Sequence, residues 1–359
     1  MRILLTGGGT MGSVSPLLAI VEETKLQNIQ ADFLWLGTKL GPENKIVGEY
    51  GLPFIAVHGG KLRRYFSWQN FLDPLRIVAG FFQGLNIIYK FKPDIIISAG
   101  AFISVPIVFA GWLLRVPILV HQQDIIPGLA NKLMMPYAKK ITVAFEQSLK
   151  DYPKDKVSWL GNPIRQSIFQ SNRTAALAKF NLTADLPVLL VLGGGTGALA
   201  LNQLVADNLN ELVSFCQVIH ITGSGKALAV SDTPAVASRY HPYEFLTTDL
   251  ALAYAAADLV VSRAGLSTLT ELANLGKPTI LIPIENSHQE ANANYFARYN
   301  AVEVAAQSSL DGQKFVDLVQ GLINNLAQLH SLTRNIKTLM KTGAAKAVVD
   351  LILSLTKKP

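Results

Sequence analysis

The chain lacks the sequence features that mark disulfide-stabilised and metal-dependent proteins. Cys216 is its only cysteine among 359 residues, so no disulfide can form within the chain, and a reducing cytoplasm fits this composition. The sequence contains no Asp-x-Asp pair and no group of histidines at metal-ligand spacing. We therefore expect neither a metal ion nor another cofactor. The first residues run straight into a predicted strand, and we expect no signal peptide.

Charged residues are also scarce, at 16% of the chain, whereas half of all residues are hydrophobic. This composition predicts a large buried core, and the length suits two α/β domains better than one. The net charge of +7 lies entirely in residues 1–165, which carry 18 Lys or Arg against 11 Asp or Glu.

The positive charge is densest in residues 61–92, where cations and aromatic side chains alternate around a lone Asp73. The cations are Lys61, Arg63, Arg64, Arg76, Lys90 and Lys92, and the aromatic residues are Tyr65, Phe66, Trp68, Phe71, Phe81, Phe82, Tyr89 and Phe91. Such a segment is typical of a surface that rests on an anionic membrane. Alternatively, the aromatic side chains pack inward and the cations are simply solvated. We expect no nucleic-acid partner, because no RNA- or DNA-binding motif accompanies the segment.

Two glycine-rich turns of one design each follow a predicted strand and precede a predicted helix. Residues 2–6 lead into Gly7-Gly-Gly-Thr-Met-Gly12, and residues 187–192 lead into Gly193-Gly-Gly-Thr-Gly-Ala198. Glycine permits positive φ and close approach of a ligand, and the N–H groups at a helix start favour an anion. The two turns predict two Rossmann-like α/β halves that face a shared cleft for phosphorylated compounds.

Hydrophobic runs alternate with helix-length segments along the rest of the chain. Further strands rich in Ile, Val and Leu are predicted at 94–98, 116–120, 140–144, 218–221, 258–262 and 279–282. This pattern predicts parallel sheets covered by helices on both faces. Residues 95–114 carry no charge and are long enough to span a membrane. We instead predict a strand, a loop at 99–103 and a helix capped by Ser104.

The first turn also matches the dinucleotide-binding fingerprint of dehydrogenases, Gly-x-Gly-x-x-Gly. That site needs an acidic residue at the end of the second strand to hold a ribose. The corresponding runs, residues 33–38 and 218–223, end in neither Asp nor Glu. We therefore interpret both turns as phosphate-facing loops of another enzyme class.

Seven motifs, in the same order and over nearly the whole chain, resemble those of the MurG glycosyltransferases. They are Thr6-Gly-Gly-Gly-Thr-Met-Gly-Ser-Val-Ser-Pro16, Lys92-Pro-Asp-Ile-Ile-Ile97, His121-Gln-Gln-Asp-Ile-Ile-Pro-Gly-Leu-Ala-Asn131, Gly161-Asn-Pro-Ile-Arg165, Ala257-Asp-Leu-Val-Val-Ser-Arg-Ala-Gly265, Thr268-Leu-Thr-Glu271 and His288-Gln-Glu-Ala-Asn-Ala293.

The resemblance implies a GT-B fold of two Rossmann-like domains with parallel sheets facing a central cleft. It implies an acceptor domain at 1–163, a UDP-sugar domain at 164–343 and a last helix at 344–359 that returns to the first domain. The implied reaction is an inverting, metal-independent transfer of N-acetylglucosamine from UDP-N-acetylglucosamine to lipid I, a polyprenyl-diphosphate-linked muramyl peptide, at the cytoplasmic face of the cell membrane.

The resemblance also implies a set of donor-side residues. Glu271 matches a ribose ligand and Leu246 an apolar residue beside the uracil, and Gln289 and Asn292 match a sugar-contacting run. The remaining donor-side positions are Arg165, Gly195, Thr196, Arg263, Leu266, Ser267 and Thr268.

Each donor-side assignment has a structural alternative. Thr268-x-x-Glu271 is also a capping box. Leu246 also suits a core position, and the two amides also suit helix caps. Arg165 and Arg263, the candidate cations for the leaving diphosphate, also suit surface or inter-domain ion pairs.

The chain departs from the family at the residues nearest the chemistry. The family usually has Gly-Gly-His where this chain has Met11-Gly12-Ser13, His-Glu-Gln-Asn where it has His121-Gln-Gln-Asp124, and Gly-Gly-Ser-Gln-Gly where it has Gly193-Gly-Gly-Thr-Gly197. Attack by a sugar hydroxyl needs a proton acceptor, and a serine is too weak a base to replace an imidazole.

The catalytic candidates are Asp124 and, second, His121, with Ser13 at the position of the family histidine. The alternative for His121 is a buried, hydrogen-bonded residue at a strand end. Residues on the acceptor side and first glycine loop are Thr10, Met11, Gly12, Phe102 and Asp124.

Two other functions remain open on the sequence alone. A related GT-B enzyme with a different acceptor lipid or donor sugar fits the altered first turn. A paralogue that binds a nucleotide sugar without turning it over fits the missing histidine. The oligomeric state is also left open.

Overall fold

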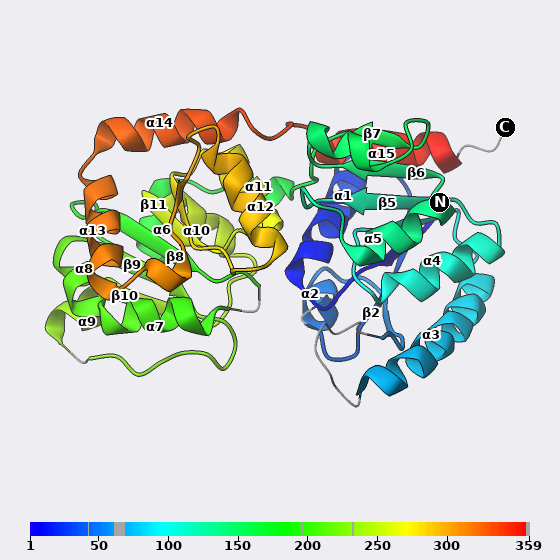
Figure 1. Cartoon of the computed structure of the whole chain (residues 1–359), viewed down its shortest axis with the longest axis horizontal. Helices are drawn as coiled ribbons and strands as arrows, with labels where there is room; N and C mark the ends of the chain where they lie inside the picture. Colours follow the sequence, from blue (N-terminus) through cyan, green and yellow to red (C-terminus); the bar gives the residue numbers. More distant parts are fainter. Residues whose placement is uncertain (42, 61–68, 196, 232, 357–359) are drawn as a thin grey trace. The chain divides into compact units, whose positions relative to one another are not determined.

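The computed structural model describes residues 1–41, 43–60, 69–195, 197–231 and 233–356. The chain divides into two compact units, which we call unit 1 (Met1–Arg165 with Lys341–Pro359) and unit 2 (Gln166–Met340). In each unit a parallel sheet is enclosed by helices (Figure 1).

Unit 1 is built on a seven-stranded sheet in the order β3-β2-β1-β4-β5-β6-β7. The strands are β1 (Arg2–Thr6), β2 (Asp32–Gly37), β3 (Phe54–Ala56), β4 (Ile95–Ser98), β5 (Ile118–Gln122), β6 (Lys140–Val143) and β7 (Val157–Trp159). The helices are α1 (Ser15–Leu26), α2 (Glu43–Glu49), α3 (Gln69–Phe91), α4 (Ser104–Leu113), α5 (Leu129–Met134) and α15 (Ala344–Thr356), with 3₁₀ turns η1 (Met11–Ser13), η2 (Met135–Tyr137) and η3 (Glu146–Asp151). Helix α15, from the end of the chain, packs against α1.

Unit 2 is built on a six-stranded sheet in the order β10-β9-β8-β11-β12-β13. The strands are β8 (Val188–Leu192), β9 (Gln217–Ile221), β10 (Tyr240–Tyr243), β11 (Leu259–Ser262), β12 (Thr279–Leu281) and β13 (Glu303–Val304). The helices are α6 (Arg173–Lys179), α7 (Leu199–Asp207), α8 (Leu209–Phe215), α9 (Pro234–Arg239), α10 (Leu250–Ala256), α11 (Leu266–Leu275), α12 (His288–Ala297), α13 (Gly312–Ile323) and α14 (Leu326–Lys337), with 3₁₀ turns η4 (Gln166–Phe169) and η5 (Gln307–Ser309).

The prediction of parallel sheets covered on both faces is confirmed. Strands β4, β5, β8, β9 and β11 are buried at every position, because helices cover both of their faces. The uncharged run at 95–114 forms β4, a loop and α4, as predicted. The predicted cap at Ser104 is wrong by one residue. Ile103 occupies the N-cap, and the Ser104 hydroxyl donates to the Gly100 carbonyl at 2.7 Å.

The strand order reverses once in each sheet, and these points decide where a ligand can bind. In unit 1 the reversal lies between β1 and β4, and in unit 2 between β8 and β11. The loops that leave the carboxyl ends of such a strand pair diverge to opposite faces and open a crevice. Both glycine turns leave the first strand of such a pair.

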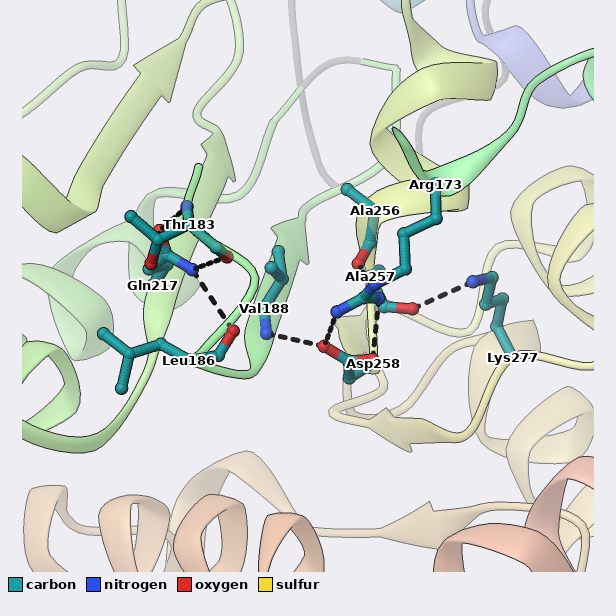
Figure 2. Close-up of polar contacts among 9 residues, drawn as sticks. All are labelled: Arg173, Thr183, Leu186, Val188, Gln217, Ala256, Ala257, Asp258 and Lys277. Carbon is teal, nitrogen blue, oxygen red and sulfur yellow. Dashed lines mark hydrogen bonds and ion pairs between the residues drawn. The ribbon is translucent and has the colours of Figure 1, made fainter. Parts of the chain in front are cut away.

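A polar cluster holds the amino ends of the central strands of unit 2, at the end of the sheet opposite to the glycine turn (Figure 2). Arg173 of α6 donates to both carboxylate oxygens of Asp258, at 2.8 Å each, and Asp258 also accepts the Val188 N–H at 2.8 Å. Lys277 donates to the Ala257 carbonyl at 2.8 Å, and burial lowers the pKa of its ammonium to about 8. The cluster therefore fixes the starts of both central strands.

We predict that Asp258→Ala destabilises unit 2 by about 1–3 kcal/mol, because the substitution leaves the Val188 N–H without its acceptor and the Arg173 guanidinium with the Ala256 carbonyl alone. Thermal unfolding of the variant measures this loss. Asp317→Ala, on the exposed face of α13, is the matched control and should change stability by no more than about 0.5 kcal/mol. Equal melting temperatures for the two variants would contradict the prediction.

Candidate active site

The first glycine turn, at the carboxyl end of β1, is held by side chains of its own unit. The Gly8 N–H donates to Ser13 Oγ at 2.9 Å, and the Gly9 N–H donates to Glu43 Oε2 at 3.0 Å. The Trp35 indole donates to the Gly7 carbonyl at 3.0 Å. The interpretation of this turn as phosphate-facing is therefore wrong for Gly8 and Gly9, whose N–H groups already have acceptors.

Ser13 closes this turn through the hydrogen bonds of its hydroxyl. Its hydroxyl is buried, accepts the Gly8 N–H and lies 3.1 Å from the Gly8 carbonyl and 3.3 Å from the Thr10 carbonyl. The family histidine is thus replaced by a residue that shapes the backbone. Thr10 is exposed, and Met11 and Gly12 are half-buried. Residues 10–12 of the turn are therefore accessible to a ligand.

His121, the second candidate base, is enclosed by hydrogen-bond partners inside unit 1. The ring lies in β5 with 1% exposure, Nδ1 is 2.9 Å from Thr142 Oγ1, and Nε2 is 2.8 Å from Asn162 Oδ1. Burial lowers the pKa of the imidazole to about 4. With both nitrogens hydrogen-bonded, His121 is the buried strand residue of the alternative interpretation.

Asp124 follows β5 in a half-buried position, held by its neighbour Gln122. The Gln122 amide donates to the Asp124 carbonyl at 2.6 Å, while Gln122 Oε1 accepts from Asn131 at 2.5 Å and from the Tyr152 hydroxyl at 3.2 Å. Burial raises the pKa of Tyr152, which keeps its hydroxyl a donor. Sequence reasoning singled out Asp124 and missed this support.

Two other predicted residues also lie in unit 1. Phe102 is in the loop after β4, the second strand of the reversal, and packs partly buried against the core. Arg165 has 8% exposure, and its Nη1 donates to the Tyr50 hydroxyl at 3.3 Å. It belongs by its contacts to unit 1, although the sequence boundary placed it in the donor domain.

The second glycine turn, at the carboxyl end of β8, differs from the first. Gly194 has a φ of 82°, and its carbonyl accepts the Gly197 N–H at 3.1 Å. Among the residues that the structure describes, the N–H groups of Gly194 and Gly195 have no acceptor. These two amides can therefore receive an anion. Thr196, also predicted to bind the donor, lies outside the described residues.

Helix α11 begins directly after β11, the second strand of the reversal, and corrects the capping-box interpretation. Gly265 is the N-cap, so Thr268 lies within the first turn and cannot cap the helix. Glu271 is buried in the next turn, where its Oε2 accepts from the Tyr254 hydroxyl at 2.9 Å. Leu266 is buried, and Ser267 and Thr268 are half-buried at the helix start.

Arg263 follows β11 and points into unit 2. Its side chain donates to the Ile282 carbonyl at 2.7 Å and to Gln307 Oε1 at 2.6 Å, and its Nε is buried without a hydrogen-bond partner. With 6% exposure it is no surface ion pair, and burial lowers its pKa from the usual value. It borders a cavity of about 310 Å³ that α7 and η5 also line.

The last three donor-side candidates all make contacts within unit 2. Asn292 of α12 is fully buried and donates to the Ala264 carbonyl at 3.1 Å, which fixes the turn between β11 and α11. Gln289 accepts the Ile284 N–H at 3.0 Å, and Leu246 packs partly buried against the core. Ser287, rather than either amide, caps α12. No three acidic, His or Cys side chains of the described residues gather as a metal site.

Comparison with known proteins adds a whole-chain similarity to this geometry. Residues 3–143 match the glycosyltransferase family 28 N-terminal domain, and residues 188–349 match the glycosyltransferase family 28 C-terminal domain. The chain is 35% identical over 98% of both chains to a Bacillus cereus protein named UDP-N-acetylglucosamine--N-acetylmuramyl-(pentapeptide) pyrophosphoryl-undecaprenol N-acetylglucosamine transferase 2. It is 36% identical to a Legionella pneumophila transferase of the corresponding name, over 98% of this chain and 96% of that one.

The chain belongs to the MurG family. The crystal structure of Acinetobacter baumannii MurG agrees, with 26% identity, a TM-score of 0.72 and coverage of 98% of this chain and 99% of that one. The family resemblance seen in the sequence is thus confirmed, and so is the GT-B class of the fold.

We predict that lowering the pH below about 6.5 destabilises the protein through its two buried histidines. His121 and His220 are both buried with pKa values of about 4, so between pH 6.5 and 4 the unfolded chain binds protons that the folded chain does not. Stability is complete above pH 6.5 and falls below it, by about 1.4 kcal/mol for each pH unit and histidine.

Thermal melting from pH 7 downward measures this effect. His121→Asn should lower the melting temperature at neutral pH but flatten its dependence on pH, whereas His330→Asn, on the exposed face of α14, should leave the profile unchanged. An unaltered slope in His121→Asn would contradict the prediction.

Proposed function

We propose that this chain transfers N-acetylglucosamine from UDP-N-acetylglucosamine to the muramyl sugar of lipid I, the step that forms lipid II for peptidoglycan synthesis. The observation that carries the proposal is the 35–36% identity, over 98% of the chain, to transferases named for this reaction. In the transfer, an acceptor hydroxyl oxygen bonds to the anomeric carbon, the bond from that carbon to the UDP oxygen breaks with inversion, and UDP leaves.

Unit 2 is proposed to bind the donor. The open N–H groups of Gly194 and Gly195 and the start of α11 are suited to the diphosphate, because backbone donors stabilise a leaving anion without a metal ion. Glu271 is proposed for the ribose, Leu246 for the uracil and Gln289 for the sugar. Arg165 and Arg263 remain proposed cations for the diphosphate. The other proposed donor contacts are Gly195, Thr196, Leu266, Ser267, Thr268 and Asn292.

Unit 1 is proposed to bind the acceptor, with Asp124 as the proton acceptor. Ser13 and His121 are buried and hydrogen-bonded within the fold. Asp124 is half-buried, in the loop after β5. A carboxylate at this position can take the proton of the attacking hydroxyl. Thr10, Met11, Gly12 and Phe102 are proposed to border the acceptor.

UDP release in the presence of lipid I and UDP-N-acetylglucosamine tests this function. We expect release that EDTA does not reduce. Release with a different lipid acceptor only would favour a related GT-B enzyme, and donor binding without release would favour a non-catalytic paralogue.

Asp124→Asn should lower kcat by about 10²–10⁴-fold and leave UDP affinity unchanged, because the amide keeps the size of the side chain but cannot accept the proton. Asp155→Asn, at an exposed position of unit 1, is the control and should retain normal turnover. Near-normal turnover of Asp124→Asn would remove Asp124 from the mechanism.

We further propose that α3 and α4 rest on an anionic membrane, so that the enzyme is peripheral to the cytoplasmic face. Large apolar side chains on these two packed helices (Figure 1) are exposed, namely Leu75, Val78, Phe82, Tyr89, Phe109, Trp112 and Leu113. Exposed cations stand nearby in the chain, at Lys90, Lys92 and Arg115. A surface that combines apolar side chains with cations binds anionic lipid. Within the described residues, the structure contains no helix that is both long and apolar enough to cross a bilayer.

The alternative interpretation of residues 61–92, in which their aromatic side chains pack into the core, applies to only some of these side chains. Phe81 and Phe91 pack against the core, with Phe81 5.6 Å from the Phe109 ring, whereas Phe82 and Tyr89 are 62% and 70% exposed. Residues 61–68, with three of the cations, lie outside the described residues, as does the side chain of Phe71.

We predict that the double variant Phe82→Ser with Trp112→Ser binds anionic phospholipid vesicles at least about tenfold more weakly, since two apolar side chains are lost from the contact. Cosedimentation with vesicles measures this. Leu326→Ser removes an equally exposed apolar side chain from unit 2 and should leave binding unchanged. Equal vesicle binding by both proteins would contradict the proposed surface.

A further inference from the structure

A buried carboxylate lies against the first glycine turn. Glu43 is the first residue of α2, and its side chain is fully buried. Its Oε2 accepts the Gly9 N–H at 3.0 Å, and its Oε1 accepts the Thr38 N–H at 2.7 Å and the Thr38 hydroxyl at 2.5 Å. All three of these contacts are donors directed at the carboxylate, as they would be in a site for an external anion.

The surrounding backbone is shaped to this carboxylate. A Cβ on Gly8 or Gly41 would overlap the Glu43 carboxylate, and a Cβ on Gly37 would lie 3.0 Å from its Cγ. Gly9 has a φ of 79°, which turns its N–H toward Oε2. Glycines from three segments thus leave the space that the Glu43 side chain fills.

The corresponding turn of unit 2 holds no such internal acid. The N–H groups of Gly194 and Gly195 have no acceptor within the described part of the chain. Two turns of one sequence design therefore differ in how their N–H groups are satisfied. One contains its own anion, and the other is open to an external anion.

We propose that Glu43 is an internal substitute for a phosphate group and a positioning residue of the acceptor unit. It holds residues 7–9 in the shape of an anion-binding turn and, by its charge and volume, excludes a second anion from them. The diphosphate of the donor is thereby directed to unit 2, and an acceptor in unit 1 meets the turn at residues 10–12 rather than at residues 7–9. The consequences for transfer rest on the proposed function, whereas the exclusion of an anion does not.

Glu43→Ala tests the substitution directly, because it opens the carboxylate's place while the Gly9 and Thr38 donors stay in position. We expect this variant to melt at a lower temperature than the wild type and to recover several degrees as inorganic phosphate is added, at constant ionic strength and with saturating UDP present to fill unit 2. Glu49→Ala, at the exposed end of the same helix, should show only the phosphate dependence of the wild type. Equal phosphate dependence in both variants would overturn the proposal.

Glu43→Gln is the second variant, since it keeps the size of the side chain but turns an NH₂ group toward one of the donors. We expect it to raise the KM for the lipid acceptor by about tenfold and to leave the KM for UDP-N-acetylglucosamine within about twofold. Phosphate should partly restore the acceptor KM in Glu43→Ala but not in Glu43→Gln, whose side chain still fills the place.

The remaining outcomes are also decisive. Wild-type kinetics in a folded Glu43→Gln protein would overturn the positioning role. Failure of both variants to fold would reduce Glu43 to a stability residue and would equally overturn it. Absence of transfer by the wild type would refute the proposed function alone, because the phosphate titration of Glu43→Ala reports on the turn without any reaction.

Discussion

A backbone N–H beyond the end of a parallel strand needs an acceptor from the protein, from solvent or from a ligand, and this constraint sets the roles of the two glycine turns. In unit 1 the neighbouring strand supplies one only for the first residue of the turn, since the Gly7 N–H donates to the Leu36 carbonyl at 3.4 Å. The later residues of the turn need other acceptors. In unit 1 the acceptors are the side chains of Ser13 and Glu43. In unit 2 the Gly194 and Gly195 N–H groups have none among the described residues. Two glycine turns of similar sequence thus differ, because one has acceptors within its own unit and the other can accept an external anion.

The segment between β11 and α11, next to the open turn of unit 2 at the strand reversal, is held in place by polar side chains. Asn292 donates to the Ala264 carbonyl, and Arg263 donates to the Ile282 carbonyl and to Gln307. These bonds fix the backbone between β11 and α11, which is the second wall of the crevice at the strand reversal. Buried polar groups that are paired in this way make a site rigid, and a rigid site stabilises a developing charge without reorganising.

The sequence patterns predicted the architecture well because burial on both faces leaves a direct signal. The runs of Ile, Val and Leu at β4, β5 and β11 can only be buried strands, and the glycine turns follow from the residues that the chain needs at positive φ. Local sequence patterns gave wrong predictions where residues far apart in the chain determine the local structure. Thr268-x-x-Glu271 has the spacing of a capping box, but the end of β11 starts the helix earlier, at Leu266.

Glu43 escaped sequence reasoning for the same reason. Its acceptor role depends on Gly9, 34 residues earlier in the chain, and a glutamate at a helix start is ordinary. The available signal was the pair of glycines at 37 and 41, where a Cβ would lie close to the Glu43 side chain and, at Gly37, also to Phe54. Ser13 was similarly judged by what it replaces in the family, whereas its position next to the Gly8 N–H is what determines its role.

Asp124 and Gln122 are physically coupled, which gives the altered motif after β5 a single explanation. The Gln122 amide donates to the Asp124 carbonyl, and its oxygen accepts from Asn131 and Tyr152. A carboxylate at position 122 has no hydrogen to give to that carbonyl, and it would add a second negative charge beside Asp124. An amide at 122 therefore avoids a second negative charge close to the acid at 124. The family's usual motif has the acid at the second position and the amide at the fourth, the reverse of Gln122 and Asp124. In this chain the loop position 124 carries the carboxylate, and the buried position 122 carries no charge.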